Sequence, residues 1–378
     1  MEAQERIMEL IILFQTGGDR MKTLRVEKLC KKMREHGIDQ VIVTSKANVY
    51  YFTGAYLDPM RRLLALIINS DGSSVYYVNR LFHIDPCVQT ELVFWDDTQD
   101  PTELMGKAIK KGGTVAVDQD WQARFLLGLM KAQPDASYIN MPELIDSLRA
   151  VKDQEEIEIL KESSRINDKV MTEIFENIRP DISELALSRM RYELFAKYGA
   201  NAYGTNVIFS YGAHCAEAHH VSDDTLPKAG DCIMFDMGAP YQYYGSDQTR
   251  TVFYKEVSPE MEKIYHIVLR AHLEASAAIR PGVPCSEIDR IARDIISGEG
   301  YGAYFTHRTG HGIGLDSHEF PDISLSCHAP LEEGMVFSVE PGIYLPGKGG
   351  VRIENLFVVT KDGAETLNHL PRELKVIG

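Results

Sequence analysis

Two kinds of hydrophobic pattern alternate along the first part of the chain. Short apolar runs rich in Val, Ile and Tyr predict strands, and stretches with apolar residues at every third or fourth position predict helices. The predicted strands are 40–44, 63–69, 74–79, 91–95 and 114–118, and the predicted helices are 23–37, 101–111 and 121–130. This alternation predicts an α/β domain that ends between residues 141 and 150.

The second part of the chain is predicted to begin with helices and to continue with strands. One long amphipathic pattern predicts a helix from near Ser147 to residue 178, which Pro180 then ends. Further helices are predicted at 182–199, 258–279 and 285–300, and strand-like runs follow the first and the last of these helices. We therefore place a domain boundary between residues 146 and 147.

A faint internal repeat links two of these strand-like regions. Asp236 and Glu340 each follow an apolar run that a glycine opens six positions earlier. A second acidic residue, Asp247 or Glu354, follows eleven or fourteen positions later and opens another apolar run. Because side chains alternate between the faces of a strand, two such hairpins are expected to bring four carboxylates together on facing strands of one sheet.

The composition limits the partners that the chain can bind. The 378 residues carry a formal net charge of −15, which argues against a nucleic-acid or anionic-membrane partner. No run of eighteen or more apolar residues occurs, so no membrane span is expected. The six cysteines form no C-x-x-C pair, which predicts reduced thiols and a cytoplasmic protein.

The first residues of the chain do not fit the pattern of the rest. A short apolar run in residues 1–20 has an acidic flank and is too short for a signal peptide. Gly17, Gly18 and Asp19 stand just before a second methionine, Met21, and could be a translated ribosome-binding sequence. We interpret residues 1–20 as an N-terminal extension and Met21 as the natural start.

Four acidic residues and one histidine are the candidate metal ligands. Asp236, Asp247, Glu340 and Glu354 lie beside apolar runs, where an unpaired carboxylate is costly. His311 lies in T-G-H-G-I-G, and we interpret its glycines as allowing the backbone to pass close to a bulky centre. Oxygen donors with one nitrogen suit two closely spaced divalent cations such as Mn²⁺, Co²⁺ or Zn²⁺. Two such ions can hold a hydroxide and polarise a carbonyl, so hydrolysis is the leading hypothesis.

Other polar residues are candidates for roles around this centre. His219 and His318 could donate hydrogen bonds to a substrate carbonyl or an oxyanion, or could only orient a carboxylate. Arg352 stands two positions before Glu354 and so shares its face of a strand. Its guanidinium could bind a substrate carboxylate or simply offset the acidic charge. The weaker candidates are His220, the rival of His219, and His214 and His307.

These stretches resemble the pita-bread metallopeptidases. The segments that carry the resemblance are D236-MGAPYQYYGS-D247-QTRT, H311-GIGLDSH318-E, E340-PGIY and G350-VRIE354-N. That family includes Xaa-Pro dipeptidase (prolidase), aminopeptidase P and methionine aminopeptidase. The first half resembles the creatinase-like N-terminal domain of prolidases and aminopeptidases P, which simple methionine aminopeptidases lack. The resemblance implies a creatinase-like α/β domain over 21–146 and an α+β pita-bread catalytic domain with pseudo-twofold symmetry over 147–378.

The resemblance also implies which residues hold the two metal ions. Asp236, Asp247 and Glu354 would hold one ion, and Asp247, His311, Glu340 and Glu354 would hold the other. Asp247 and Glu354 would bridge the two. A hydroxide between the ions would attack the scissile carbonyl, with Glu340 as proton acceptor and donor.

Substrate contacts follow from the same resemblance. His219 and His318 would stabilise the intermediate or position the substrate, and Arg352 would help to recognise the end of the substrate. One position departs from the family, because Ser317 stands where a β-branched apolar residue is more common. This departure leaves the metal ligands intact and affects only the packing beside His318.

The resulting prediction is an Xaa-Pro dipeptidase that uses two divalent ions, with Mn²⁺ the first choice and Co²⁺ or Zn²⁺ as alternatives. An aminopeptidase P that acts on longer peptides is the main competing function. A metal-free creatinase-type hydrolase and a non-catalytic binding protein are disfavoured because all five ligand positions are filled. A homodimer is expected from the resemblance alone. We also expect activity to fall below about pH 6, because protonation of His311 or the carboxylates would release metal.

Overall fold

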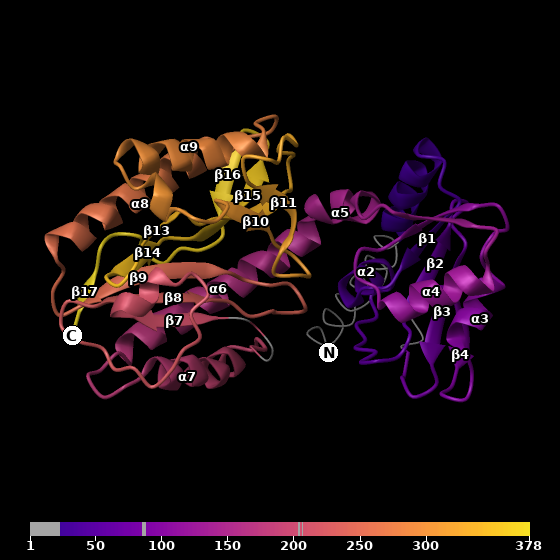
Figure 1. Ribbon diagram of the computed structural model, residues 1–378, viewed down its shortest axis with the longest axis horizontal. Helices are drawn as coiled ribbons and strands as arrows, with labels where there is room; N and C mark the ends of the chain where they lie inside the picture. Colours follow the sequence, from indigo (N-terminus) through magenta and orange to yellow (C-terminus); the bar gives the residue numbers. More distant parts are fainter. Residues whose placement is uncertain (1–22, 85–87, 203–204, 206) are drawn as a thin grey trace, which may run out of the picture. The chain divides into compact units, whose positions relative to one another are not determined.

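A computed structural model describes residues 23–84, 88–202, 205 and 207–378 of the chain. The chain divides into two compact units, Met1–Arg149 and Ala150–Gly378 (Figure 1). The N-terminal extension expected over residues 1–20 lies outside the described residues. Within these described ranges, no helix is long and apolar enough to cross a membrane.

The first unit is built on a six-stranded mixed sheet in the order β4-β3-β2-β1-β5-β6 (Figure 1). Strand β1 pairs antiparallel with β2 and parallel with β5. The strands are β1 (Gln40–Val43), β2 (Ala65–Asn69), β3 (Ser74–Asn79), β4 (Glu91–Trp95), β5 (Thr114–Val117) and β6 (Ser137–Asn140). The α/β class expected for this part of the chain is confirmed, and β6 is the strand that the hydrophobic pattern missed.

The helices of the first unit include one that the sequence did not predict. They are a helix over 23–35, α2 (Lys46–Thr53), α3 (Pro101–Gly106), α4 (Ala123–Ala132) and α5 (Glu143–Ala150). Helix α2 was missed because its residues are rich in Val, Tyr, Phe and Thr, which favour strands. Its ends explain why it forms. The Ser45 side chain accepts a hydrogen bond from the Asn48 backbone N–H, and Gly54 closes the helix in the left-handed conformation.

The single long helix expected up to residue 178 is wrong. Helix α5 ends earlier, and α6 (Gln154–Glu176) begins after a three-residue break. Asp153 caps α6 by accepting a hydrogen bond from the Glu156 backbone N–H, and the Glu156 side chain accepts one in return. In the break, the backbone N–H of Lys152 donates to Gly334 in another part of the unit. The amphipathic pattern continues across the break, which is why periodicity alone joined the two helices.

The second unit contains two main sheets. The first has the order β17-β9-β8-β7, the second has the order β11-β10-β12-β15-β16, and β13 pairs with β14 in a hairpin. The strands of the first are β7 (Ile208–Tyr211), β8 (Cys232–Met237), β9 (Gln248–Tyr254) and β17 (Val376–Ile377). Those of the second are β10 (Gly310–Gly312), β11 (Glu319–Ile323), β12 (Val336–Val339), β15 (Asn355–Thr360) and β16 (Gly363–Thr366). The hairpin strands are β13 (Gly342–Leu345) and β14 (Gly349–Arg352).

The two acid-bearing segments form matching antiparallel pairs, but in different sheets. In the β8–β9 pair Asp236 lies opposite Thr249, and in the β12–β15 pair Val339 lies opposite Asn355. The expectation of a single sheet is therefore wrong. The sheets meet where the Glu354 backbone N–H donates to the Thr249 carbonyl at 3.1 Å. This junction brings the ends of both pairs to one place.

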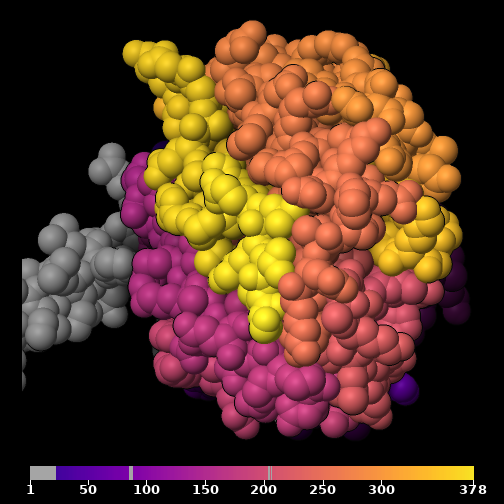
Figure 2. Space-filling model, turned by 90° about the vertical axis from the view of Figure 1, so that its left-hand side faces the viewer, coloured from indigo at the N-terminus to yellow at the C-terminus, as the bar shows by residue number. Residues whose placement is uncertain are grey.

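Helices cover the outer faces of these sheets (Figure 1). Helices α6 and α7 (Glu184–Lys197) share an apolar core with β7, β8 and β9, and α8 (Pro259–Ala277) and α9 (Cys285–Gly298) share one with β12 to β15. Two short 3₁₀ helices, η1 (Gly212–Ala216) and η2 (Gly302–Tyr304), complete the unit. The C-terminal residues, yellow in Figure 2, run between the magenta and orange segments, and β17 pairs parallel with β9.

Candidate metal centre

The structure brings the predicted ligands together from both sheets. Asp236 lies in β8, Asp247 precedes β9, His311 is the middle residue of β10, and Glu340 and Glu354 flank the β13–β14 hairpin. His311 Nε2 lies 3.3 Å from a Glu340 carboxylate oxygen and 3.8 Å from an Asp247 oxygen. One ligand atom from each of Asp247, His311 and Glu354 lies within 4.8 Å of the other two. Asp236 lies close enough to this group for its charge to help raise the pKa of Asp247.

The glycines beside His311 are required by neighbouring backbone. A Cβ atom on Gly310 would lie 1.8 Å from the Ser338 carbonyl oxygen, and one on Gly312 would lie 2.4 Å from that of Phe320. Close packing between strands is therefore one reason for these glycines. Their relation to a bulky centre, as interpreted from the sequence, stays a prediction.

His311 is held with one ring nitrogen turned towards the carboxylates. Its backbone N–H donates to the Ser338 hydroxyl at 3.0 Å. Its Nδ1 lies 3.1 Å from the Gly312 carbonyl oxygen, an acceptor, which places the ring proton on Nδ1. Nε2 then presents its lone pair to Asp247 and Glu340, as a metal ligand requires.

Burial controls the protonation of this centre. It raises the pKa of Glu340 to about 7 and holds the pKa values of Asp247 and Glu354 well above their usual range, with neighbouring carboxylates adding to the last two shifts. Burial lowers the pKa of His311 to about 3. The loss of activity expected below about pH 6 stays a prediction, and these pKa shifts favour the carboxyl groups over His311 as the groups that take up protons first. Four crowded carboxylates and one neutral imidazole are a donor set that fits divalent cations.

Arg352 is buried within the same group. Its guanidinium donates to Asp236 at 2.5 Å, to the Tyr344 hydroxyl at 2.8 Å and to the Thr249 hydroxyl at 3.1 Å. These contacts use all three guanidinium nitrogens. They fit the first of two roles that the sequence allowed, which were to offset the acidic charge or to bind a substrate carboxylate. A contact between Arg352 and the substrate stays a prediction.

Thr249 is a residue of the centre that the sequence reasoning missed. Its hydroxyl donates to a Glu354 oxygen at 2.7 Å and accepts from Arg352. Thr249 thereby links a predicted ligand to the guanidinium. The available signal was its position two residues after Asp247, which places both side chains on the same face of the strand.

The histidines predicted to surround the centre separate into two groups. The His318 ring lies 4.0 Å from the His311 ring in an edge-on arrangement, and burial lowers the pKa of His318. His219 is exposed and contributes to the electrostatic surroundings of His318. Its rival, His220, pairs instead with Glu184, which is not one of the predicted ligands.

Metal binding is expected to displace protons from this centre. Because the folded-state pKa of Glu340 is raised to about 7, ionising the buried carboxyl destabilises the metal-free protein as the pH rises through that value, and a bound cation removes this cost. Lowering the pH below these raised pKa values should therefore weaken the apparent Mn²⁺ affinity by about tenfold per pH unit for each proton displaced. Calorimetric titrations at pH 6 and pH 8, in buffers of different ionisation heat, measure both quantities. Constant affinity across this range would contradict the raised pKa values.

Comparison with known proteins places both units in recognised families. Residues 158–361 match metallopeptidase family M24, and residues 25–151 match the creatinase/prolidase N-terminal domain. An uncharacterized peptidase of Staphylococcus aureus (strain USA300) is 34% identical over 355 residues, covering 91% of this chain and 99% of the relative.

Solved structures show the same likeness over nearly the whole chain. A recombinant prolidase from Thermococcus sibiricus is 34% identical with a TM-score of 0.89, covering 93% of this chain and 98% of that one. An X-Pro aminopeptidase from Thermotoga maritima is 30% identical with a TM-score of 0.82, covering 93% and 99%.

Proposed function

The chain belongs to metallopeptidase family M24, and from this premise we propose that it is an Xaa-Pro dipeptidase. It has the creatinase N-terminal domain followed by the pita-bread catalytic domain, and it is a metallopeptidase of the prolidase or aminopeptidase P type. The proposed reaction is hydrolysis of the bond between an N-terminal residue and proline. The observation that carries the proposal is the close group formed by Asp247 with the buried residues His311 and Glu354.

We propose that two divalent ions, Mn²⁺ before Co²⁺ or Zn²⁺, bind to Asp236, Asp247, His311, Glu340 and Glu354. The fit rests on three buried carboxyl groups whose pKa values are raised and on an imidazole whose Nε2 faces them. When bound, a metal pair supplies an activated water and polarises the scissile carbonyl.

The side chains around the ions carry the remaining steps of the proposal. Glu340 is proposed to accept a proton and to return it to the leaving amine, the role that the likeness to the family implies for it. His318 and His219 position the peptide and donate hydrogen bonds to its carbonyl. Arg352 fixes Asp236 through their hydrogen bond and is also proposed to recognise the end of the substrate.

An aminopeptidase P is the competing assignment, since the similar Thermotoga maritima structure is that of an X-Pro aminopeptidase. The likeness to the Thermococcus sibiricus prolidase is somewhat greater in both identity and TM-score, and we propose the dipeptidase on that ground. A metal-free creatinase-type hydrolase has no need of this group of buried acids. The homodimer and the cytoplasmic location stay predictions.

Substrate length is the property that separates the two assignments. With Mn²⁺ added, we expect cleavage of Ala-Pro at least about tenfold more efficiently than Ala-Pro-Ala, and no cleavage of Ala-Ala. A tenfold preference corresponds to about 1.4 kcal/mol of differential transition-state binding. Chromatographic detection of free alanine measures all three rates. Faster cleavage of Ala-Pro-Ala would indicate an aminopeptidase P, and cleavage of Ala-Ala alone would refute the specificity for proline.

A further inference from the structure

A second group of histidine and acidic side chains lies in the catalytic unit and shares no residue with the candidate metal centre. Its anchor is Glu184, the first residue of α7, whose side chain is completely buried. The backbone N–H of Tyr211 donates to Oε1 of Glu184 at 2.6 Å, and that of Asp223 donates to Oε2 at 3.2 Å. Each carboxylate oxygen therefore has one lone pair fixed by the backbone and one left for another partner.

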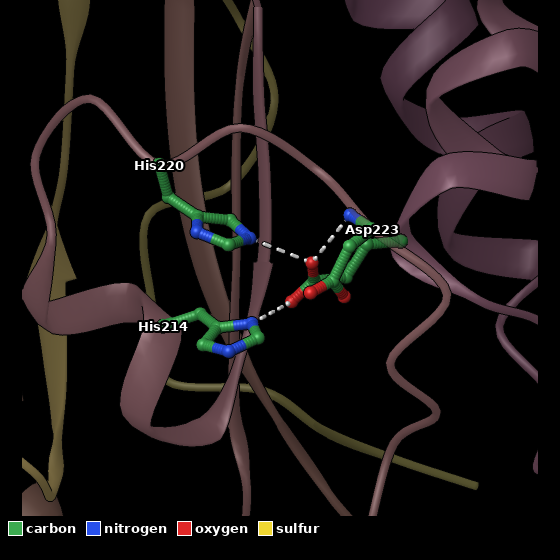
Figure 3. A group of neighbouring side chains, drawn as sticks. His214, His220 and Asp223 are labelled. Carbon is green, nitrogen blue, oxygen red and sulfur yellow. Dashed lines mark hydrogen bonds and ion pairs between the residues drawn. The ribbon is translucent and has the colours of Figure 1, made fainter.

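Two imidazoles occupy these remaining positions. His214 Nδ1 lies 3.0 Å from Oε1 of Glu184, and His220 Nε2 lies 2.8 Å from Oε2 (Figure 3). The two rings stack with centroids 4.2 Å apart and planes inclined by 27°. His214 lies in η1 and His220 in the loop that follows it, so this short segment presents two nitrogen atoms to a single buried carboxylate.

Asp223 completes the group. One ligand atom from each of Glu184, His214, His220 and Asp223 lies within 4.8 Å of the other three (Figure 3). A carboxylate oxygen of Glu217 lies 3.8 Å from Nδ1 of His220, the nitrogen that faces away from Glu184. An acidic partner on the far ring nitrogen is the usual way to orient a metal-binding histidine.

The charge balance of the group calls for a cation. A fully buried carboxylate is costly unless it is paired with positive charge. In the part of the chain that the structure describes, the ion pairs of Glu184 are with His214 and His220, and none is with lysine or arginine. Asp223 adds a second negative charge beside it. A single divalent ion would neutralise both carboxylates at once.

We propose that Glu184, His214, His220 and Asp223 form a further metal site that binds Zn²⁺ or a similar transition-metal ion. Two imidazole nitrogens with carboxylate oxygens are a common zinc donor set, whereas Mn²⁺ and Mg²⁺ prefer sites richer in oxygen. Each imidazole keeps its proton on the ring nitrogen that faces away from the ion. His214 is about one-third exposed and Asp223 is exposed, so an ion enters from the solvent side.

The position of the site suggests its effect. The backbone N–H groups of Glu184 and Leu185 already donate to the carbonyls of Thr225 and Asp223, which holds the loop against the start of α7. A bound ion would add direct links from Glu184 to the same loop. His219, predicted to contact the peptide, is adjacent to His220 in this loop. The site would therefore brace a segment that borders the candidate centre.

The test separates this site from the candidate centre by blocking the centre first. The protein carrying Asp247→Asn and Glu354→Gln is equilibrated with Zn²⁺ in the presence of excess Mn²⁺, and bound metal is measured by mass spectrometry after dialysis. We expect about one zinc per chain in this parent. Adding His214→Gln and His220→Gln should remove that equivalent, whereas adding His36→Gln and His369→Gln, both exposed and elsewhere, should retain it.

Two results would overturn the proposal. One is a parent that binds no zinc, and the other is an unchanged zinc content after His214 and His220 are both replaced. Circular dichroism checks that each variant is folded. If the double replacement disturbs folding, Asp223→Asn alone serves in its place, because the backbone N–H that supports Glu184 remains, and at least a tenfold weaker zinc affinity is then expected. Since the readout is metal content in an inactive parent, its outcome is independent of the peptide specificity proposed above.

Discussion

Asp247→Asn is expected to lower kcat/KM for Ala-Pro by about a thousandfold or more. Asp247 directly precedes β9, and one of its carboxylate oxygens lies 3.8 Å from His311 Nε2. Asparagine keeps the shape but loses a negative charge that a divalent ion needs. Loss of the Lewis acid is worth several kcal/mol, and each 1.36 kcal/mol corresponds to a factor of ten in rate.

The variant should remain folded, because burial already raises the pKa of Asp247 and a neutral amide removes the cost of burying a charge. Metal analysis, activity and circular dichroism on the same preparation measure the three properties. Asp362→Asn, in an exposed turn, is the matched control and should retain both metal and activity. Global unfolding of the Asp247 variant would assign this residue a structural role instead, and full activity would contradict the proposed centre.

The candidate ligands could be found from the sequence because buried acids break a hydrophobic pattern. Asp236 and Glu340 each end an apolar run, and an acid in such a position needs a partner. The equal spacing of the preceding glycines then relates the two runs to each other. The structure places both acids at the ends of antiparallel pairs, Asp236 in β8 and Glu340 just after β12. Local pattern was therefore sufficient to select these two acids as candidate ligands, although it did not find Thr249.

The arrangement of those parts depends on contacts that no local pattern contains. The two sheets join through the backbone of Glu354 and Thr249, which are 105 residues apart. Helix α6 begins late because Asp153 caps it, although the amphipathic period continues across the break. His214 and His220 pair with the carboxylate of Glu184 at the start of α7, 30 and 36 residues earlier in the chain. Long-range hydrogen bonds decide each of these cases.

The substitution Glu340→Gln is expected to separate metal binding from proton transfer. Glu340 is proposed both to hold metal and to carry a proton between the attacking water and the leaving amine. Glutamine keeps the length and one carbonyl oxygen as a ligand, and the Ser338 hydroxyl, 3.2 Å from Oε1, can still donate to that oxygen. The amide cannot carry the proton. We expect kcat to fall by about 10²–10⁴-fold, the usual contribution of general acid–base catalysis.

Metal content and KM distinguish this result from that of Asp247→Asn. In the Glu340 variant most of the bound metal should remain and KM should change by less than about threefold, so the loss lies in kcat, as expected for an interaction made in the transition state. Glu333→Gln, exposed in the turn before β12, is the matched control and should match the unmodified protein. Parallel loss of metal and activity would make Glu340 a ligand only. An unchanged kcat would mean that another group carries the proton. His318, whose ring contacts that of His311, would then be the next residue to substitute.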